Sequence, residues 1–296
     1  MRFFRFLIAI VLFSLPTSRL WAEVPNVTTD IPAVHSLVSQ VMGELGQPSL
    51  LVSGLADLHH FQLRPSQIRN LGDADLVFWI GDDLTPWLAR ALETVGDTDR
   101  SVALIDQPDT FQIVTNNGDS DHSGRDLHIW LDPENALIWF GVIALRLSEL
   151  DPENREIYQH NADAAKHSLR KTITNSTAIL SETGPHQIIT THDAFGHFAN
   201  RFGIKIAGSV SDGEASAPSA ARIKHLRTIL EADQIQCAFL EPLQPSAILE
   251  PLIEGFDIRI GVLDPSGTSL TPGADLYSDL INSLVRAIAD CSSHQT

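Results

Sequence analysis

The middle of the chain holds a long stretch without glycine or proline, and this stretch constrains the fold more than any other feature. It follows Asp151-Pro152, ends before Gly184 and predicts one helix to about Ser181, roughly 30 residues or ~45 Å at 1.5 Å per residue. A helix of that length is unusual inside one small lobe and would serve as a stiff strut between two. We therefore expect an α/β protein of two lobes, residues 23–151 and 184–296, joined by a rigid helix at 152–183.

Short apolar runs on both sides of this helix predict buried strands. They cover residues 26–30, 50–54 and 75–80 before the helix, and residues 187–191, 235–240 and 258–263 after it. Apolar residues at helical spacing predict helices over 34–45, 67–71, 134–150 and 276–289, and a further helix that opens at Asp193. Ser66 is placed to cap the second of these helices.

One unit of this pattern occurs twice. In the first half, Pro65-Ser66 opens a helix that leads through Ala74-Asp75 into a strand. In the second half, Pro218-Ser219 opens a helix that leads through Ala232-Asp233 into a strand. The internal spacing differs between the two copies, so the repeat is imperfect, but it predicts two lobes of similar plan.

The first 22 residues have the features of a secretory signal peptide. Arg2 and Arg5 give a positive start, residues 6–15 are an unbroken apolar run, and the segment ends on the small residue Ala22. The apolar run is shorter than the about 20 residues that span a bilayer, and no cysteine lies near the cleavage point to carry a lipid. We expect cleavage after about Ala22, leaving 296 − 22 = 274 residues in an exported compartment, not embedded in a membrane.

The chain is strongly acidic. Its formal net charge is −17 at pH 7, and removal of Arg2, Arg5 and Arg19 takes it to −20 because residues 1–22 contain no acid. This charge argues against nucleic acid and anionic membrane surfaces as partners and suits a cationic ligand. The only cysteines, Cys237 and Cys291, form an even pair, which in an oxidising compartment favours a disulfide over two unrelated buried thiols.

Four polar side chains lie in loops at the edges of predicted strands or helices: His59, His128, His192 and Asp264, two from each lobe. His192 follows a predicted strand and lies at the carboxyl edge of a sheet, the usual ligand-binding place in open α/β folds. Imidazole nitrogens with one carboxylate oxygen complete a tetrahedral shell for an ion such as zinc. The residues are 64 or more positions apart, so their spacing alone does not establish that they converge.

The segments around these residues resemble a known family. The four segments are His59-His-Phe-Gln-Leu-Arg-Pro-Ser, His128-Ile-Trp-Leu-Asp-Pro, Thr-His192-Asp-Ala-Phe-Gly and Val-Leu-Asp264-Pro-Ser-Gly. Together they are similar to the metal-binding segments of zinc ABC-importer substrate-binding proteins, the ZnuA-like group of the cluster A-I metal-binding family. The resemblance covers essentially the whole mature chain, including the long helix, Glu241-Pro242 and the two late cysteines. It implies two pseudo-symmetric α/β lobes, one rigid backbone helix, and a metal site in the cleft between the lobes.

The resemblance also implies the function. Such a protein captures Zn²⁺ in the periplasm with high affinity and delivers it to an ABC permease and its ATPase; we expect a monomer and not an enzyme. The metal ligands would be the four residues of those segments. His60 and Glu241 would contact a ligand instead of the metal.

Two departures from the family pattern bear on the site. Many members carry a long histidine- and acid-rich loop in the first lobe, whereas here residues 115–126 are short and contain only His122. Some members have a glutamate just before the first histidine, and here that position is Leu58. This leaves Asp264 or water as the fourth ligand.

Three other functions are also consistent with the sequence. The first is a manganese-specific importer component of the same fold, and the second is a surface adhesin. The third is a zinc-dependent hydrolase, which would keep an open metal position for water and a general base nearby. Binding of Asp264 would close the shell, and the sequence contains no short hydrolase motif such as His-Glu-x-x-His.

Overall fold

The structure is a computed structural model. It describes residues 24–54, 58, 60–96, 99–114, 124–184, 186–211, 219–232, 235–242 and 244–293. The predicted signal peptide, His59, His122 and most of the 115–126 loop lie outside these residues.

The described strands form two parallel sheets of four strands each. The first sheet contains β1 (Val27–Thr29), β2 (Ser49–Leu50), β3 (Leu76–Trp79) and β4 (Ser101–Ala103), in the order β2-β1-β3-β4. The second contains β5 (Gln187–Thr190), β6 (Lys205–Ser209), β7 (Cys237–Leu240) and β8 (Arg259–Val262), in the order β6-β5-β7-β8. Strand for strand the two orders are the same, which confirms the prediction of two α/β lobes of similar plan.

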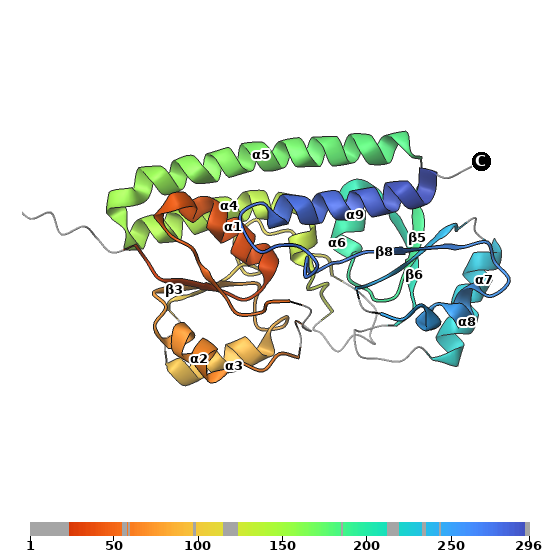
Figure 1. The fold of residues 1–296 in the computed structure, drawn as a ribbon, viewed down its shortest axis with the longest axis horizontal. Helices are drawn as coiled ribbons and strands as arrows, with labels where there is room; N and C mark the ends of the chain where they lie inside the picture. Colours follow the sequence, from red (N-terminus) through yellow and green to blue (C-terminus); the bar gives the residue numbers. More distant parts are fainter. Residues whose placement is uncertain are drawn as a thin grey trace, which may run out of the picture.

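Helices cover both sheets (Figure 1). In the first lobe, α1 (Pro32–Met42) and α4 (Pro133–Leu150) lie on one side of the sheet, and α2 (Pro65–Gly72) and α3 (Pro86–Val95) lie on the other. The second lobe carries α6 (Gly196–Phe202), α7 (Ala220–Ala232), α8 (Glu250–Ile253) and α9 (Leu276–Ser293). Four 3₁₀ turns complete the described elements: η1 (Gly43–Leu45), η2 (Ile129–Leu131), η3 (Pro152–Asn154) and η4 (Ser246–Ile248).

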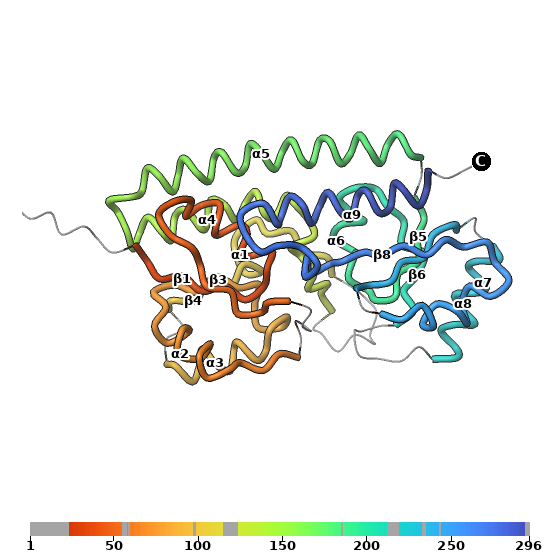
Figure 2. The backbone as a smooth tube through the Cα atoms, in the orientation of Figure 1, coloured from red at the N-terminus to blue at the C-terminus, as the bar shows by residue number. Residues whose placement is uncertain are grey.

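The long helix is present as α5 (Arg155–Glu182), 28 residues preceded by η3. Its buried residues, Tyr158, Ala162, Ala165, Leu169, Ser176 and Leu180, recur at intervals of three, four or seven and therefore share one face. This face rests on α4 in the first lobe and on α9 in the second, so α5 runs along both lobes (Figures 1 and 2).

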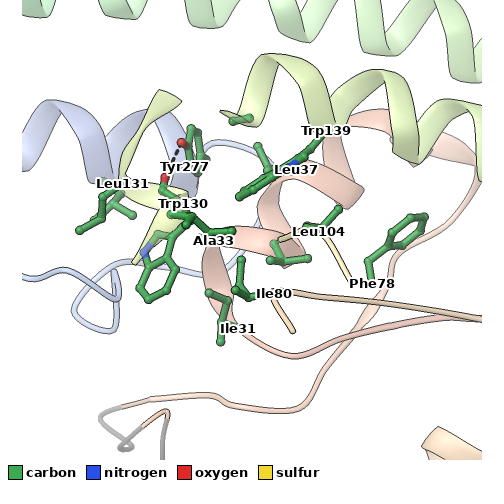
Figure 3. Close-up of a cluster of buried hydrophobic side chains, with 14 of the residues drawn as sticks. Ile31, Ala33, Leu37, Phe78, Ile80, Leu104, Trp130, Leu131, Trp139 and Tyr277 are labelled. Atoms are coloured by element: carbon green, nitrogen blue, oxygen red, sulfur yellow. Dashed lines mark hydrogen bonds between the residues drawn. The ribbon is translucent and has the colours of Figure 1, made fainter. Parts of the chain in front are cut away.

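The C-terminal helix α9 also returns to the first lobe. The Ser36 hydroxyl on α1 donates to the carbonyl of Ala274 at 2.7 Å and accepts from the backbone N–H of Tyr277 at 3.0 Å. The Tyr277 hydroxyl donates to the carbonyl of Trp130 at 2.6 Å inside a cluster of buried apolar side chains (Figure 3). The two lobes are therefore packed against each other by polar and apolar contacts, in addition to the link through α5.

Cys237 and Cys291 form a disulfide with Cα atoms 6.2 Å apart. The bond joins the first residue of β7 to α9, so it attaches the C-terminal helix to the second sheet. The predicted pairing is confirmed.

A carboxylate is buried at the carboxyl end of β1. Asp30 is fully buried, and it accepts from the backbone N–H groups of Ile31 at 2.7 Å and Ile80 at 2.8 Å. Burial raises the pKa of Asp30 to about 7, although these hydrogen bonds oppose the shift. Asp30 thus joins the ends of β1 and β3 inside the first lobe.

Two helix starts differ from the sequence-based expectation. Arg64, not Ser66, is the N-cap of α2, because Pro65 already occupies the first helical position and the Gln67 side chain accepts from the Arg64 N–H at 2.8 Å. The helix expected to open at Asp193 begins at Gly196. Residues 191–193 form a bend instead, in which the Thr190 hydroxyl donates to the carbonyl of His192 at 2.9 Å.

No helix in the described part of the chain is both long enough and apolar enough to cross a bilayer.

Candidate metal site

His128 lies immediately before η2, at the end of the first lobe that faces the second. Its ring is buried and its Nδ1 is 3.0 Å from Asp126 Oδ1. The same oxygen accepts the backbone N–H of His128 at 2.9 Å, a local turn formed by an aspartate two positions upstream. Burial alone would raise the pKa of Asp126, but the hydrogen bond and charge of His128 hold it below its ordinary value. Because a carboxylate oxygen only accepts, Nδ1 carries the proton of this hydrogen bond, and Nε2 is the nitrogen that remains for a metal ion.

His192 has an analogous partner in the second lobe. It follows β5, and Glu241 follows the adjacent parallel strand β7, so both lie at the same edge of the sheet. His192 Nδ1 is 2.9 Å from Glu241 Oε1, and both side chains are largely buried. The Gln244 side-chain oxygen accepts from the Glu241 N–H at 2.9 Å and from the Thr191 hydroxyl at 2.6 Å, which fixes the two loops together. His192 is therefore also held at its Nδ1, and Nε2 is the nitrogen that remains for a metal ion.

The two rings come from different lobes and lie side by side. The ring centres of His128 and His192 are 5.0 Å apart, with an angle of 75° between the ring planes. Two imidazoles bound to one tetrahedral zinc ion at about 2.0–2.1 Å would place their ring centres about 5 Å apart. Metal-binding histidines characteristically donate their other N–H to a carboxylate, as both do here. This pair has the ring separation and the carboxylate contacts that a shared metal ion requires.

Asp264 lies two residues after the end of β8 and is largely buried. One carboxylate oxygen accepts from the Ser266 N–H at 3.1 Å; the other accepts from the backbone N–H of Ser269 at 2.9 Å and its hydroxyl at 2.6 Å. The next residue, Pro265, accepts at its carbonyl from the Trp130 ring N–H at 2.8 Å. The Asp264 loop is thereby tied to the element that follows His128.

His59 lies outside the described residues, and His60 is exposed. Among the residues that are described, no three histidine, cysteine or acidic side chains are already grouped as a metal shell. The structure thus brings His128 and His192 together, and it attaches the loop of Asp264 to the first lobe beside them.

Helix α6, which follows His192 in the second lobe, contacts the first lobe beside His128. His197 is fully buried and its Nε2 is 3.2 Å from the carbonyl oxygen of Asp126. Arg201 forms two hydrogen bonds with the buried Asp132 carboxylate, Nε to Oδ1 at 2.7 Å and Nη2 to Oδ2 at 2.9 Å. Burial, and next the charge of Asp126, raise the pKa of Asp193 just before this helix. Several charged groups of both lobes are therefore concentrated at this boundary.

Sequence reasoning did not identify Asp126 as a partner of His128. The available signal was an aspartate two residues before a candidate ligand, the spacing at which its side chain accepts from that residue's N–H. The contact of His197 with Asp126 had no signal in the sequence, because it joins residues 71 positions apart.

Comparison with known proteins identifies relatives over nearly the full chain. A family model described as "ZnuA: Zinc-uptake complex component A periplasmic" matches residues 27–291. The high-affinity zinc uptake system protein ZnuA of Paracoccus denitrificans is 40% identical over 301 residues, covering 91% of this chain and 92% of that protein. The protein of the same name from Brucella suis is 32% identical over 314 residues, covering 93% and 94%.

Solved structures share the fold at lower identity. A zinc-bound ZnuA deletion mutant has a TM-score of 0.78 at 23% identity, covering 92% of this chain and 100% of that one. The Mn²⁺ complex of FpvC from Pseudomonas aeruginosa has a TM-score of 0.79 at 18% identity, also covering 92% and 100%. The same architecture therefore occurs in structures solved with either metal bound.

Proposed function

Because the chain belongs to the ZnuA family of periplasmic zinc-uptake components, we propose that it binds Zn²⁺ with high affinity in the periplasm. It then delivers the ion to an ABC permease and its ATPase. The observation that carries this proposal is the pair His128 and His192, two imidazoles from different lobes with ring centres 5.0 Å apart, each bonded at Nδ1 to a carboxylate. Zinc is the cargo of the protein, and it is released unchanged.

The proposed ligands are His59, His128, His192 and Asp264. Three nitrogens and one carboxylate form a shell that suits tetrahedral zinc, whereas manganese prefers oxygen-rich shells of higher coordination number. Asp126 and Glu241 support the shell by fixing two of the imidazoles. Asp264 would bind the ion through Oδ1, which among the described residues accepts only the Ser266 N–H at 3.1 Å and the Thr268 hydroxyl at 3.5 Å; otherwise water completes the shell.

The same proposal covers the lobe boundaries, the export of the protein and its oligomeric state. Residues 1–22 would direct export and be removed after about Ala22, leaving lobes at 23–151 and 184–296 with the linking segment 152–183. The mature protein would act as a monomer, without catalysis. Intact-mass analysis of protein from the native host tests the cleavage, and a mass that retains residues 1–22 would overturn it.

Metal titration of three variants tests the proposed site. His192→Ala should weaken zinc binding on the order of 100-fold or more, since the loss even of an outer partner costs about 10–100-fold. His192→Glu should narrow the preference for zinc over manganese, because it exchanges a nitrogen for a carboxylate. His160→Ala, which removes an exposed histidine from α5, is the matched control and should change neither affinity; His122→Ala should also have little effect.

Three outcomes would overturn the proposal. Unchanged zinc affinity in His192→Ala would remove this histidine from the site and with it the argument for zinc. Turnover of model esters or peptides by the zinc-loaded protein, lost in His192→Ala, would instead establish the alternative of a zinc hydrolase. Tighter binding of Mn²⁺ than of Zn²⁺ by the unmodified protein would establish the manganese alternative.

A further inference from the structure

Asp126, the carboxylate that orients His128, is itself held from the other lobe. Its carbonyl oxygen is 3.2 Å from Nε2 of His197 on α6. Its carboxylate packs against the neighbouring Gly196 so closely that a Cβ atom built there would be 2.5 Å from Asp126 Oδ2. Two adjacent residues of α6 thus contact both the backbone and the side chain of Asp126.

The hydrogen bond from His197 has a defined direction. A carbonyl oxygen only accepts, so Nε2 must carry the proton and donate. Burial lowers the pKa of His197, which keeps its imidazole neutral at pH 7 with the lone pair on Nδ1. Nδ1 is buried and has no hydrogen-bond partner among the described residues. A phenylalanine would fill similar space without leaving a buried acceptor unpaired, so packing alone does not account for a histidine at this position.

The two proposed ligands are therefore arranged by one short segment of the second lobe. Residue 192 supplies one imidazole directly, and residues 196–197 reach across the boundary to Asp126, whose Oδ1 receives Nδ1–H of His128 at 3.0 Å. The ring of His197 also meets Phe111 of the first lobe edge-on, with ring centres 5.8 Å apart. Any shift of α6 relative to the first lobe would displace Asp126 and turn the ring of His128.

We infer that His197 is a positioning residue for the metal site: its hydrogen bond to the Asp126 carbonyl, together with the close approach of Gly196, sets the orientation and tautomer of His128 from the opposite lobe. The expected effect of His197 on zinc affinity rests on the proposed function. The expected effect of His197 on the orientation of His128 does not. The ring of a ligand in the first lobe is oriented only while α6 of the second lobe is seated against it. Metal affinity is thereby coupled to the relative position of the lobes.

The test compares His197→Phe, which removes the donor, with His197→Gln, whose amide N–H restores one. The first readout is the ¹⁵N spectrum of the His128 imidazole in the metal-free protein, which reports the protonated nitrogen. His197→Phe should change this spectrum from a single Nδ1–H tautomer to a mixture, and His197→Gln should restore it. The second readout is the zinc dissociation constant, which should rise about 10-fold in His197→Phe, the lower end of the range for outer partners because Asp126 remains.

His186→Phe is the matched control. His186 is also a buried histidine, bonded to the Leu180 carbonyl at 3.0 Å and the Ser292 hydroxyl at 2.8 Å, at the far end of α5. This variant should lose stability as His197→Phe does, while the spectrum of His128 and the zinc affinity stay as in the unmodified protein. If destabilisation alone were responsible, both variants would change the His128 spectrum and the zinc affinity equally, and that result would overturn the inference.

An unchanged His128 spectrum together with unchanged zinc affinity in folded His197→Phe would also overturn it. If His197→Phe does not fold, Gly196→Ala takes its place with the same two readouts. Its added methyl group must displace the Asp126 carboxylate, so the His128 spectrum and the zinc affinity should both change. Failure of the unmodified protein to bind zinc would end the proposed function. The spectrum of the metal-free protein would still decide the inference about His197.

Discussion

Replacing Arg201 by alanine should lower the free energy of unfolding by about 3 kcal/mol, because it removes the partner of a buried charge. The Asp132 carboxylate is fully buried, caps α4 by accepting the Glu134 N–H at 3.0 Å, and receives two hydrogen bonds from Arg201 across the lobe boundary. Breaking such a pair costs about 3–5 kcal/mol. The lower value applies here because the Arg201 side chain is 31% exposed, so water reaches the carboxylate after truncation.

Urea unfolding of the metal-free protein, extrapolated linearly to water, measures this loss. Glu149→Ala is the control: it removes an ion pair to Arg146 in which both side chains are more than a third exposed, and such pairs contribute at most about 1 kcal/mol. Asp132→Asn keeps an oxygen that can cap α4 but removes the charge. In that background Arg201→Ala should cost only about 1 kcal/mol, a typical neutral hydrogen bond. A loss in Arg201→Ala no larger than in Glu149→Ala would refute the reasoning.

Three further predictions concern the disulfide, one buried acid and the long helix. Replacing Cys237 and Cys291 by alanine, which opens a loop spanning 54 positions, should lower the unfolding free energy by about 4 kcal/mol in the chain-entropy model; urea unfolding that finds less than ~1 kcal/mol would contradict this. Asp30 is protonated in the folded protein and ionised in the unfolded chain between about pH 4 and 7, so its contribution to stability falls as pH rises through that window and is constant above it. From pH 5 to 8, Asp30→Asn should therefore gain about 3 kcal/mol relative to the unmodified protein, and parallel pH profiles of the two would refute the shifted pKa. Finally, since α5 runs along both lobes, X-ray scattering of metal-free and zinc-loaded protein should give nearly equal radii of gyration, and a marked decrease on loading would indicate a flexible hinge.

The sequence by itself determined those helices and strands whose signals lie within a few neighbouring residues. The glycine- and proline-free stretch up to Gly184 predicted α5, and Asp132-Pro133 predicted the start of α4. The apolar runs predicted the central strands of both sheets. They also predicted the edge strands β2 and β8, but they missed β4 and β6, whose sequences Ser-Val-Ala and Lys-Ile-Ala-Gly-Ser contain only two consecutive apolar residues. The start of α6 was misplaced because the hydroxyl of Thr190 stabilises a bend that the helical spacing of phenylalanines does not reveal.

The residue types and the family resemblance predicted His128 and His192 as metal ligands, but only the tertiary structure places their rings together. Their ring separation of 5.0 Å depends on how two lobes pack, and 64 positions of chain separate them. The carboxylates bonded to the two imidazoles also differ in whether the sequence alone could reveal them. Asp126 is two residues from His128 and follows a local rule, whereas Glu241 reaches His192 because β5 and β7 are neighbours in one sheet. His197 reaches Asp126 only because α6 is seated on the first lobe. Local hydrogen bonds and periodicity are encoded within a few residues, but the convergence of distant side chains is decided by the packing of whole elements.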